Sequence, residues 1–250
     1  MGRLDGKVAI VTGGAKGLGK AFCFALAKEG AKVVMAAHRL DTDEAKQAAK
    51  DIEAKGGMTV EVDVTDEAST IAMADKAFKK FGRIDILVNN AAFYYGVGRK
   101  LFHEVSTEDW DKAMAVGAKG PWLCAKAVFP YMKEQKKGKI INLSSDTAFA
   151  PTKGMINYIT SKAAVVGITR VLAGELGQYN ICVNAIAPGY TDTPASWTIG
   201  NVDKFNTSDT PLGRVGKPED TVGAIVFFAS DDSDFISGQT LIIDGGRRVH

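Results

Sequence analysis

Three side chains in the middle of the sequence have the types and spacing for moving a proton to or from a substrate oxygen. Tyr158 and Lys162 are four residues apart, which places both side chains on one face of a helix. An ammonium beside a phenol favours its ionised form, and lowering a phenol pKa from about 10 to about 7 takes roughly 4 kcal/mol. Ser145, thirteen residues before Tyr158, follows an apolar run, and its hydroxyl could hold the substrate oxygen. This set predicts general acid–base chemistry with Tyr158 handling the proton.

A glycine-rich turn near the start of the chain could bind phosphate. Residues 12–19, TGGAKGLG, follow an apolar run and precede an amphipathic stretch over 20–27. Gly13 can take the backbone angles of a tight turn, while Gly17 and Gly19 let a diphosphate approach the positive end of the helix. A turn can need glycines for packing alone, but strand, turn and helix in this order favour a dinucleotide cofactor.

The elements that must position these residues alternate along the whole chain. Seven short apolar runs, separated by longer helical stretches, are typical of strands buried on both faces: Val8–Val11, Val33–Ala36, Met58–Val62, Ile86–Val88, Ile140–Leu143, Cys182–Ile186 and Leu241–Ile243. The pattern predicts an α/β fold, a Rossmann-type, doubly wound, parallel seven-stranded sheet with helices on both faces. In such a sheet the ligand crevice lies at the carboxyl ends of the strands, where the winding reverses.

One segment, 190–214, breaks this rhythm and is rich in Thr, Asp, Asn, Gly and Pro. Long loops inside a domain are usually functional, so a substrate lid is favoured over a disordered insert. We therefore expect residues 1–250 to form a single domain with a lid at 190–214.

Composition narrows the classes of partner. The chain has 250 residues, 46% hydrophobic and 24% charged, which suits one folded domain. Its 31 basic and 29 acidic residues are spread along the sequence, so no face for nucleic acid or membrane stands out and a small molecule is the expected partner. No stretch approaches the roughly 20 apolar residues of a membrane span. Three isolated cysteines and three scattered histidines predict no disulfide framework and no metal site, and a cytoplasmic location fits best.

In order and spacing, Ser145, Tyr158 and Lys162 match the serine, tyrosine and lysine of the short-chain dehydrogenase/reductase family, and the glycine turn has that family's spacing. The resemblance covers the whole chain through Asp63-Val64, Asn89-Asn90-Ala91-Ala92, the segment 184–189 (NAIAPG) with Thr193, and Asp244-Gly245-Gly246. It implies cofactor contacts from Gly13, Lys16, Gly17, Leu18, Gly19, His38, Arg39, Asp63, Val64, Asn90, Ala91, Tyr158, Lys162, Pro188, Gly189, Thr191 and Thr193.

The resemblance also implies an activity. In the family the tyrosine is the general acid in reduction and the general base in oxidation, the lysine tunes it and holds the nicotinamide ribose, and the serine positions the carbonyl. We therefore expect an NAD(P)H-dependent oxidoreductase, a short-chain alcohol dehydrogenase or carbonyl reductase acting on a ketone or secondary alcohol. The chain most resembles 3-oxoacyl-(acyl-carrier-protein) reductases and secondary-alcohol dehydrogenases, and a homotetramer is implied by resemblance alone.

Two positions depart from the family's pattern. The family carries an asparagine in the helix after the fourth strand, which helps to organise a water chain from the lysine, and here Gly117 stands in its place. Either water fills the gap and turnover is reduced, or the protein is a nicotinamide-binding regulatory or scaffold relative without catalysis. Because Ser145, Tyr158 and Lys162 are intact, a working enzyme is favoured, and an asparagine at 117 is expected to raise its turnover. Ala92 replaces the usual glycine, and packing is its default explanation.

The end of the second strand indicates which coenzyme is used. Relatives that use NAD place an aspartate there to bind the ribose hydroxyls and repel a 2′-phosphate, and this position falls at Ala37. Arg39, with Lys16 as a second candidate, could approach the phosphate instead, although either could be an ordinary surface charge. NADP(H) is therefore favoured, and NAD(H) remains open because Asp41 and Asp43 follow closely.

Aromatic residues on loops at strand ends or in the lid suggest an apolar substrate pocket. They are Phe93, Tyr94, Tyr95, Phe149, Tyr190 and Trp197, and we assign substrate contacts to Phe93, Tyr95, Tyr190 and Trp197 together with Ser145. A hydrophobic or aromatic ketone is slightly favoured over a sugar or an acyl thioester. Core packing or oligomer contacts remain the alternative for each aromatic side chain.

Overall fold

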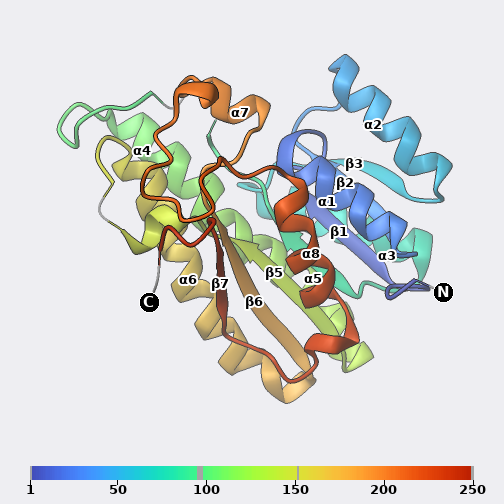
Figure 1. The fold of residues 1–250 in the computed structure, drawn as a ribbon. Coiled ribbons are helices and arrows are strands. Elements are labelled where there is room, and N and C mark those ends of the chain that lie inside the picture. Colours follow the sequence, from blue (N-terminus) through green and yellow to red (C-terminus); the bar gives the residue numbers. More distant parts are fainter. Residues whose placement is uncertain (1, 95–97, 151, 249–250) are drawn as a thin grey trace.

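The computed structural model describes residues 2–94, 98–150 and 152–248. Within them a single parallel sheet has the strand order β3-β2-β1-β4-β5-β6-β7 (Figure 1). Its strands are β1 Val8–Thr12, β2 Lys32–Ala37, β3 Met58–Glu61, β4 Ile86–Asn89, β5 Gly138–Leu143, β6 Ile181–Pro188 and β7 Thr240–Ile243. Each predicted run overlaps one strand, and the predicted Rossmann-type fold class is confirmed.

Helices cover both faces of the sheet (Figure 1). They are α1 Gly17–Lys28, α2 Asp43–Ala54, α3 Glu67–Phe81, α4 Thr107–Met114, α5 Gly120–Gln135, α6 Ile156–Leu176, α7 Pro194–Trp197 and α8 Glu219–Ala229. Alternate strand residues point to opposite faces, so Ala9 and Val11 pack toward α1, α2 and α8, whereas Val8 and Ile10 pack toward α3, α5 and α6. No helix among the described residues is long and apolar enough to cross a membrane.

The winding reverses between β1 and β4, which are neighbours in the sheet. Their carboxyl ends are tied together by Thr12, whose Oγ1 accepts the backbone N–H of Asn90 at 3.1 Å and of Ala91 at 3.2 Å. The Asn90 side chain donates back to the carbonyl oxygens of Thr12 at 2.9 Å and Gly13 at 3.2 Å. This network holds the glycine turn open at the edge where a ligand crevice is expected.

The segment 190–214 contains more regular structure than its composition predicts. It forms α7 and the short helix η4, Val202–Lys204, beyond the carboxyl end of β6 (Figure 1). The Thr193 side chain accepts the N–H of Ser196 and so caps α7, whose first position is Pro194. Across the segment, the Tyr190 and Phe205 rings stack with their centroids 4.2 Å apart. Local capping and this aromatic pair explain why the segment is ordered without an apolar period.

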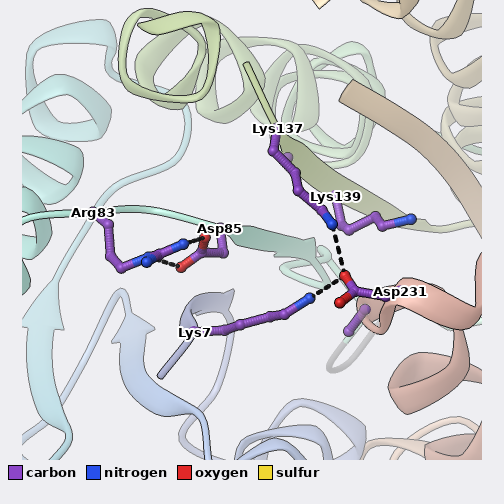
Figure 2. Close-up of a pocket in the computed structure, with 8 residues that line it drawn as sticks. Lys7, Arg83, Asp85, Lys137, Lys139 and Asp231 are labelled. Atoms are coloured by element: carbon purple, nitrogen blue, oxygen red, sulfur yellow. Dashed lines mark hydrogen bonds and ion pairs between the residues drawn. The ribbon is translucent and has the colours of Figure 1, made fainter. Parts of the chain in front are cut away.

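Charged residues gather at the opposite edge of the sheet, around a cavity of about 220 Å³ (Figure 2). Lys7 and Lys137, which precede β1 and β5, both reach Asp231, with Nζ–Oδ1 distances of 2.6 and 2.9 Å. Beside them Arg83 forms two hydrogen bonds with Asp85, at 2.6 and 2.8 Å. The Asp85 carboxylate also accepts the backbone N–H of Val8 at 2.8 Å. These contacts tie the amino ends of β1, β4 and β5 to the turn after α8.

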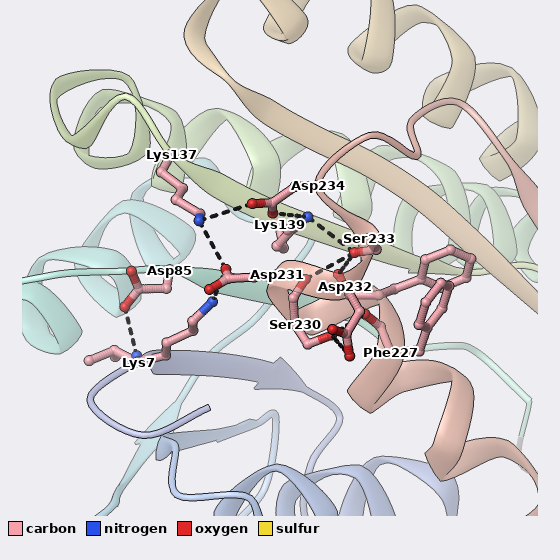
Figure 3. Close-up of polar contacts among 12 residues, drawn as sticks. Lys7, Asp85, Lys137, Lys139, Phe227, Ser230, Asp231, Asp232, Ser233 and Asp234 are labelled. Carbon is pink, nitrogen blue, oxygen red and sulfur yellow. Dashed lines mark hydrogen bonds and ion pairs between the residues drawn. The ribbon is translucent and has the colours of Figure 1, made fainter. Parts of the chain in front are cut away.

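A nearly buried lysine extends this network (Figure 3). Lys139 on β5 has its side chain 4% exposed and binds Asp234 Oδ1 at 2.8 Å and Ser233 Oγ at 3.1 Å. Lys137 bridges to the same aspartate at 3.2 Å. Since every cation around this cavity has an acidic partner, we interpret the cluster as a structural clamp at the amino edge of the sheet.

Candidate active site

A cavity of about 1220 Å³ opens at the carboxyl ends of the strands. Every residue predicted to contact the cofactor lines it, as do Ser145, Tyr158 and Lys162. These residues come from the glycine turn, the ends of β2, β3, β4, β5 and β6, helix α6 and the segment 190–214. The fold therefore brings together groups that are far apart in the sequence.

Two reciprocal hydrogen bonds fix helix α6 against the end of β5. The Lys162 Nζ donates to the Leu143 carbonyl oxygen at 2.7 Å, and the Ser144 hydroxyl donates to the Lys162 carbonyl oxygen at 2.8 Å. At the start of the helix the Asn157 side chain accepts the backbone N–H of Tyr158 at 2.9 Å. The positions of Tyr158 and Ser145 are thus set by backbone groups of two packed elements.

Tyr158 lies beside Ser145 in the cavity. Burial raises the pKa of Tyr158 to about 12, although a hydrogen bond with Ser145 opposes this and the charge of Asp146 adds to it. Burial also lowers the pKa of Lys162 to about 8, and its Nζ lies 5.9 Å from the centroid of the Tyr158 ring. In this structure burial has the largest effect on the Tyr158 pKa and the Lys162 ammonium is engaged with the Leu143 carbonyl, so the lowering of the tyrosine pKa by Lys162 stays a prediction.

The Ser145 hydroxyl has partners on its own loop. Its Oγ accepts a hydrogen bond from the Thr147 hydroxyl at 2.9 Å and from the Thr147 N–H at 3.3 Å. It donates to Asp146 Oδ1 at 3.2 Å, so binding a substrate oxygen requires the hydroxyl hydrogen to turn away from this long contact. Asp146 is 4% exposed, and burial raises the pKa of its carboxyl.

The glycine turn fits a dinucleotide diphosphate. Gly13 and Gly17 have φ values of 64° and 55°, in the left-handed region that favours glycine. A Cβ on Gly19 would lie 2.2 Å from the Gly13 carbonyl oxygen, so this position has no room for a side chain. A Cβ on Gly17 would have Thr193 Cβ as its nearest neighbour, at 3.9 Å, so Gly17 is required by its φ and not by close contact. The first turn of α1 has no acidic residue and no capping side chain, so its N–H groups suit an anion.

The adenosine end of the cavity carries mixed charge. Ala37 is the buried last residue of β2, and Arg39, Lys16 and Glu44 line the cavity around it. Arg39 is held by Asp41 through hydrogen bonds of 3.1 and 2.8 Å. Burial lowers the pKa of Lys16, Glu44 opposes this and the charge of Arg39 adds to it. A 2′-phosphate at this end would meet two cations, and it would compete with Asp41 for the Arg39 guanidinium.

Of the predicted substrate contacts, Phe93, Tyr190 and Ser145 line the cavity, whereas Tyr95 lies outside the described residues. Trp197 is not placed there, because its indole N–H donates to Asp192 at 2.8 Å and its side chain is 46% exposed. Tyr94 occupies the cavity instead, with its ring centroid 4.9 Å from that of Tyr158.

Sequence reasoning missed several charged residues of the cavity. Asp146, Arg99, Lys153, Arg247 and Arg248 all line it. Two sequence features could have indicated them, since Asp146 follows Ser145 directly and the two arginines follow the Asp244-Gly245-Gly246 motif. Their convergence on one end of the cavity could not be predicted, because it depends on the path of the chain after β7.

Gly117 has a packing role that its sequence position did not predict. It is buried in the π-helical segment η1, Ala115–Lys119, where helix α4 passes into α5. A Cβ at this position would lie 2.5 Å from Ser161 Oγ and 2.8 Å from Ser161 Cβ. The serine donates to the Tyr158 carbonyl oxygen at 2.7 Å. Gly117 thus allows close contact with the helix that carries Tyr158 and Lys162.

Comparisons with known proteins agree with this geometry. A family model described as enoyl-(acyl carrier protein) reductase matches residues 13–248. The 3-oxoacyl-[acyl-carrier-protein] reductase FabG of Thermotoga maritima is 40% identical over 248 residues, covering 98% of each chain. The (2S)-[(R)-hydroxy(phenyl)methyl]succinyl-CoA dehydrogenase subunit BbsD of Thauera aromatica is 38% identical over 250 residues, again covering 98% of each chain.

A solved structure shows the same arrangement of the chain. The 3-ketoacyl-(acyl-carrier-protein) reductase from Brucella melitensis, complexed with NADH, has a TM-score of 0.91 and 34% sequence identity. The match covers 98% of this chain and all of that one.

Proposed function

This chain belongs to the short-chain dehydrogenase/reductase family of oxidoreductases, and on that premise we propose that it interconverts a ketone and a secondary alcohol, with Tyr158 as general acid and base. The observation that carries the proposal is the meeting of Tyr158, Ser145 and Lys162 in the cavity that the glycine turn also lines. A bound nicotinamide coenzyme supplies the hydride in reduction and accepts it in oxidation.

Three side chains transfer the proton, hold the substrate oxygen and stabilise the phenolate. In reduction the Tyr158 hydroxyl donates its proton to the developing alkoxide, and in oxidation the phenolate removes the alcohol proton. Ser145 holds the same oxygen by a hydrogen bond once its contact with Asp146 is released. Lys162, whose burial lowers its pKa to about 8, stabilises the phenolate when its ammonium is charged.

The residues at the adenosine end favour NADP(H) and leave NAD(H) open. Ala37 presents no carboxylate to repel a 2′-phosphate, and Arg39 and Lys16 supply cations. The hydrogen-bonded Arg39–Asp41 pair opposes this preference, because a phosphate must compete with the carboxylate for the guanidinium. We therefore expect a moderate preference for NADPH over NADH.

The substrate end supports a ketone with an apolar part. Phe93, Tyr94, Tyr190 and Phe205 present aromatic surface to the cavity. The Thauera relative is named for a phenyl-bearing substrate, which supports an aromatic ketone, while the acyl-carrier-protein reductases keep an acyl thioester open.

We also expect a homotetramer, as the family resemblance implies. Trp122 on α5 and Val171 on α6 are 48% and 57% exposed, which suits helices that contact a second copy of the chain. Light scattering gives the mass in solution, and a monomer would contradict this expectation.

Replacing Tyr158 with Phe tests the catalytic assignment. The variant removes the transferable proton and keeps the ring, so turnover of a panel of ketones, followed by NADPH absorbance, is expected to fall at least 100-fold. Coenzyme affinity, measured by fluorescence titration, is expected to change little. Phe81→Tyr, a change on α3 outside the cavity, is the control. Retained turnover in Tyr158→Phe would contradict the assignment of Tyr158 as general acid and base.

The alternative is a nicotinamide-binding regulatory or scaffold protein, whose support in the sequence is Gly117. The contact of Gly117 with Ser161 gives this glycine a packing role that does not require lost catalysis. Tight coenzyme binding by the wild type, with no turnover of any ketone in a broad panel, would favour the scaffold.

A further inference from the structure

Two consecutive arginines, Arg247 and Arg248, line the cavity without complete hydrogen bonding, and Arg247 lies against Phe205, which stacks on Tyr190. The Nε atoms of Arg247 and Arg248 are buried and have no hydrogen-bond partner among the described residues. Buried donors are normally paired, because a donor removed from water without a partner destabilises the fold. Because these Nε atoms are themselves shielded from solvent, an anion in the cavity would meet the Nη groups of the two guanidiniums and so supply the partner that the buried donors lack.

The turn after β7 places these arginines. Asp244 Oδ1 accepts the N–H groups of Gly246 at 3.0 Å and Arg247 at 3.1 Å. Gly245 and Gly246 have φ values of 72° and 87°, so the chain reverses sharply. A Cβ on Gly245 would lie 2.9 Å from Thr210 Cγ2, which shows how closely the turn packs against the segment 190–214.

The arginines retain donors for a ligand. The Arg247 guanidinium carbon lies 5.0 Å from the centroid of Phe205, and the nearest carboxylate oxygen is Asp209 Oδ2 at 3.9 Å, on a side chain that is 69% exposed. Arg248 Nη1 donates to the Arg247 carbonyl oxygen at 3.2 Å. An aromatic face and a neutral carbonyl orient these groups, and the long contact with the exposed Asp209 compensates the charge of Arg247 only weakly.

The balance of charge at this end is positive. Arg99, Lys153, Arg247 and Arg248 line the cavity, as do the carboxylates of Asp146 and Asp209. A third carboxylate, Asp244, lies beside Gly189 near Asp146, and its buried Oδ2 has no hydrogen-bond partner among the described residues. Asp146 is the only one of these acids that is nearly buried, and burial and the charge of Asp244 raise its pKa while the two tail arginines lower it. A substrate anion would therefore enter a region with more cations than anions.

We propose that Arg247 and Arg248 bind an anionic oxygen group of the substrate, which is therefore a ketone with a carboxylate or phosphate a few bonds from its carbonyl. Arginine forks match both anions in a bidentate geometry. A Cβ on Gly189 would lie 2.7 Å from Asp244 Cβ and 3.8 Å from Asp146 Oδ2, so the turn that carries the arginines lies close to the neighbour of Ser145 and the anion lies near the reacting oxygen. Phe93 and Tyr94 remain for the apolar part. This inference rests on the proposed reduction of a ketone.

The test compares each anion with its neutral ester. The probes are 4-oxo-4-phenylbutanoate and its methyl ester, phenacyl phosphate and its dimethyl ester, and propiophenone as a neutral ketone. With NADPH and with NADH, the wild type is expected to show a kcat/KM at least tenfold higher for one anion than for its ester. The pair with the larger ratio identifies carboxylate or phosphate, and the ratio should fall as the salt concentration rises.

Variants then assign the preference to the arginines. Arg247→Gln and Arg248→Gln are expected to reduce the anion-to-ester ratio at least fivefold, mainly through KM. Arg170→Gln, on the exposed surface of α6 and outside the cavity, is the matched control and should keep the wild-type ratio.

The two proposals fail in different ways. If the wild type turns over the esters or propiophenone but its anion-to-ester ratios of kcat/KM are near one, the anion site is contradicted and the proposed function still stands. A wild-type ratio that both arginine variants retain also overturns it. Absence of turnover with every probe and both coenzymes contradicts the proposed function, and the anion site with it.

Discussion

At the scale of single residues, the buried Lys162 lowers the stability of the fold at neutral pH. A lysine whose pKa falls to about 8 on burial binds its proton less tightly in the folded than in the unfolded chain. The unfolded state therefore binds more protons between about pH 8 and 10.4, and this group makes the fold more stable as the pH rises through that window. At neutral pH the charged lysine opposes folding, which is typical of a residue retained for chemistry rather than stability.

Gly117 is the residue whose interpretation the structure changes most. The sequence predicted a missing member of a proton relay, and the expected remedy was an asparagine. The geometry predicts a different outcome, since any side chain at 117 must displace Ser161 and with it the α6 backbone around Tyr158.

We therefore expect Gly117→Ala to lower the free energy of unfolding by about 1–3 kcal/mol, through overpacking between η1 and α6. Gly117→Asn should be at least as destabilised and should lose turnover. Gly167→Ala is the matched control, because a Cβ there meets no atom within 4 Å, and it should stabilise α6 by about 0.5–1 kcal/mol. Urea unfolding of the three variants gives the comparison. Wild-type stability and higher turnover in Gly117→Asn would restore the relay interpretation.

At the scale of elements, the two edges of the sheet are built differently. The carboxyl edge carries unpaired arginine donors and a buried lysine, Lys162, that is bonded to a backbone carbonyl, whereas the lysines of the amino edge are paired with aspartates. Asp231 connects β1 and β5 to the turn after α8 through Lys7 and Lys137 (Figure 3). Hydrogen bonds from these lysines lower the pKa of Asp231 to about 2.

This clamp gives a pH-dependent contribution to stability. Because the folded pKa of Asp231 is about 2 and a free aspartate has a pKa near 4, the contribution is present above about pH 4 and is lost as the pH falls toward 2. Its size is reduced by exposure, since the Asp231 side chain is 60% exposed, and we expect about 1 kcal/mol or less.

Asp231→Asn should therefore lower the free energy of unfolding by up to about 1 kcal/mol at pH 7 and by much less at pH 2.5. The control is Asp111→Asn, because Asp111 is exposed on α4 and forms no ion pair in the described part of the chain. Denaturant unfolding at both pH values measures the differences. An effect of Asp231→Asn that is equal at pH 7 and pH 2.5 would contradict the clamp.

The helices and strands differ in how well they could be predicted from the sequence alone. Strands such as β1 and β5 were predictable because both of their faces are buried and each contains a short apolar run, although Lys139 and Asn142 interrupt the pattern in β5. The residues proposed to be catalytic could be picked out by their spacing on α6 and after β5. Helix α7 was not, since it depends on the Thr193 cap, and the place of Trp197 was not, since it depends on a hydrogen bond to Asp192. Arg247 and Arg248 reach the cavity only through the turn after β7.

At the scale of the whole molecule, the cavity joins the two halves of the sheet. Its lining includes Gly13 and Asp63 from the half that contains β1 to β3, and Ser145 and Gly189 from the half that contains β4 to β7. A coenzyme in this cavity would contact both halves, so its binding energy should stabilise the domain as one unit. Ligand binding thus reports on the function independently of turnover.

NADPH at a free concentration of 100 times its Kd should stabilise the fold by about 2.7 kcal/mol, which corresponds to a rise in Tm of roughly 5–11 °C for a chain of this size. Tyr158→Phe should show the same rise, because the phenol hydroxyl is needed for proton transfer and the glycine turn is intact. Arg39→Ala should keep the rise with NADH and lose part of the rise with NADPH at equal coenzyme concentrations, since the proposed role of the guanidinium is to bind the 2′-phosphate. Thermal denaturation with each coenzyme measures these shifts. Equal losses with both coenzymes in Arg39→Ala would show that this arginine does not select the phosphate, and no shift in the wild type would contradict a nicotinamide coenzyme in this cavity.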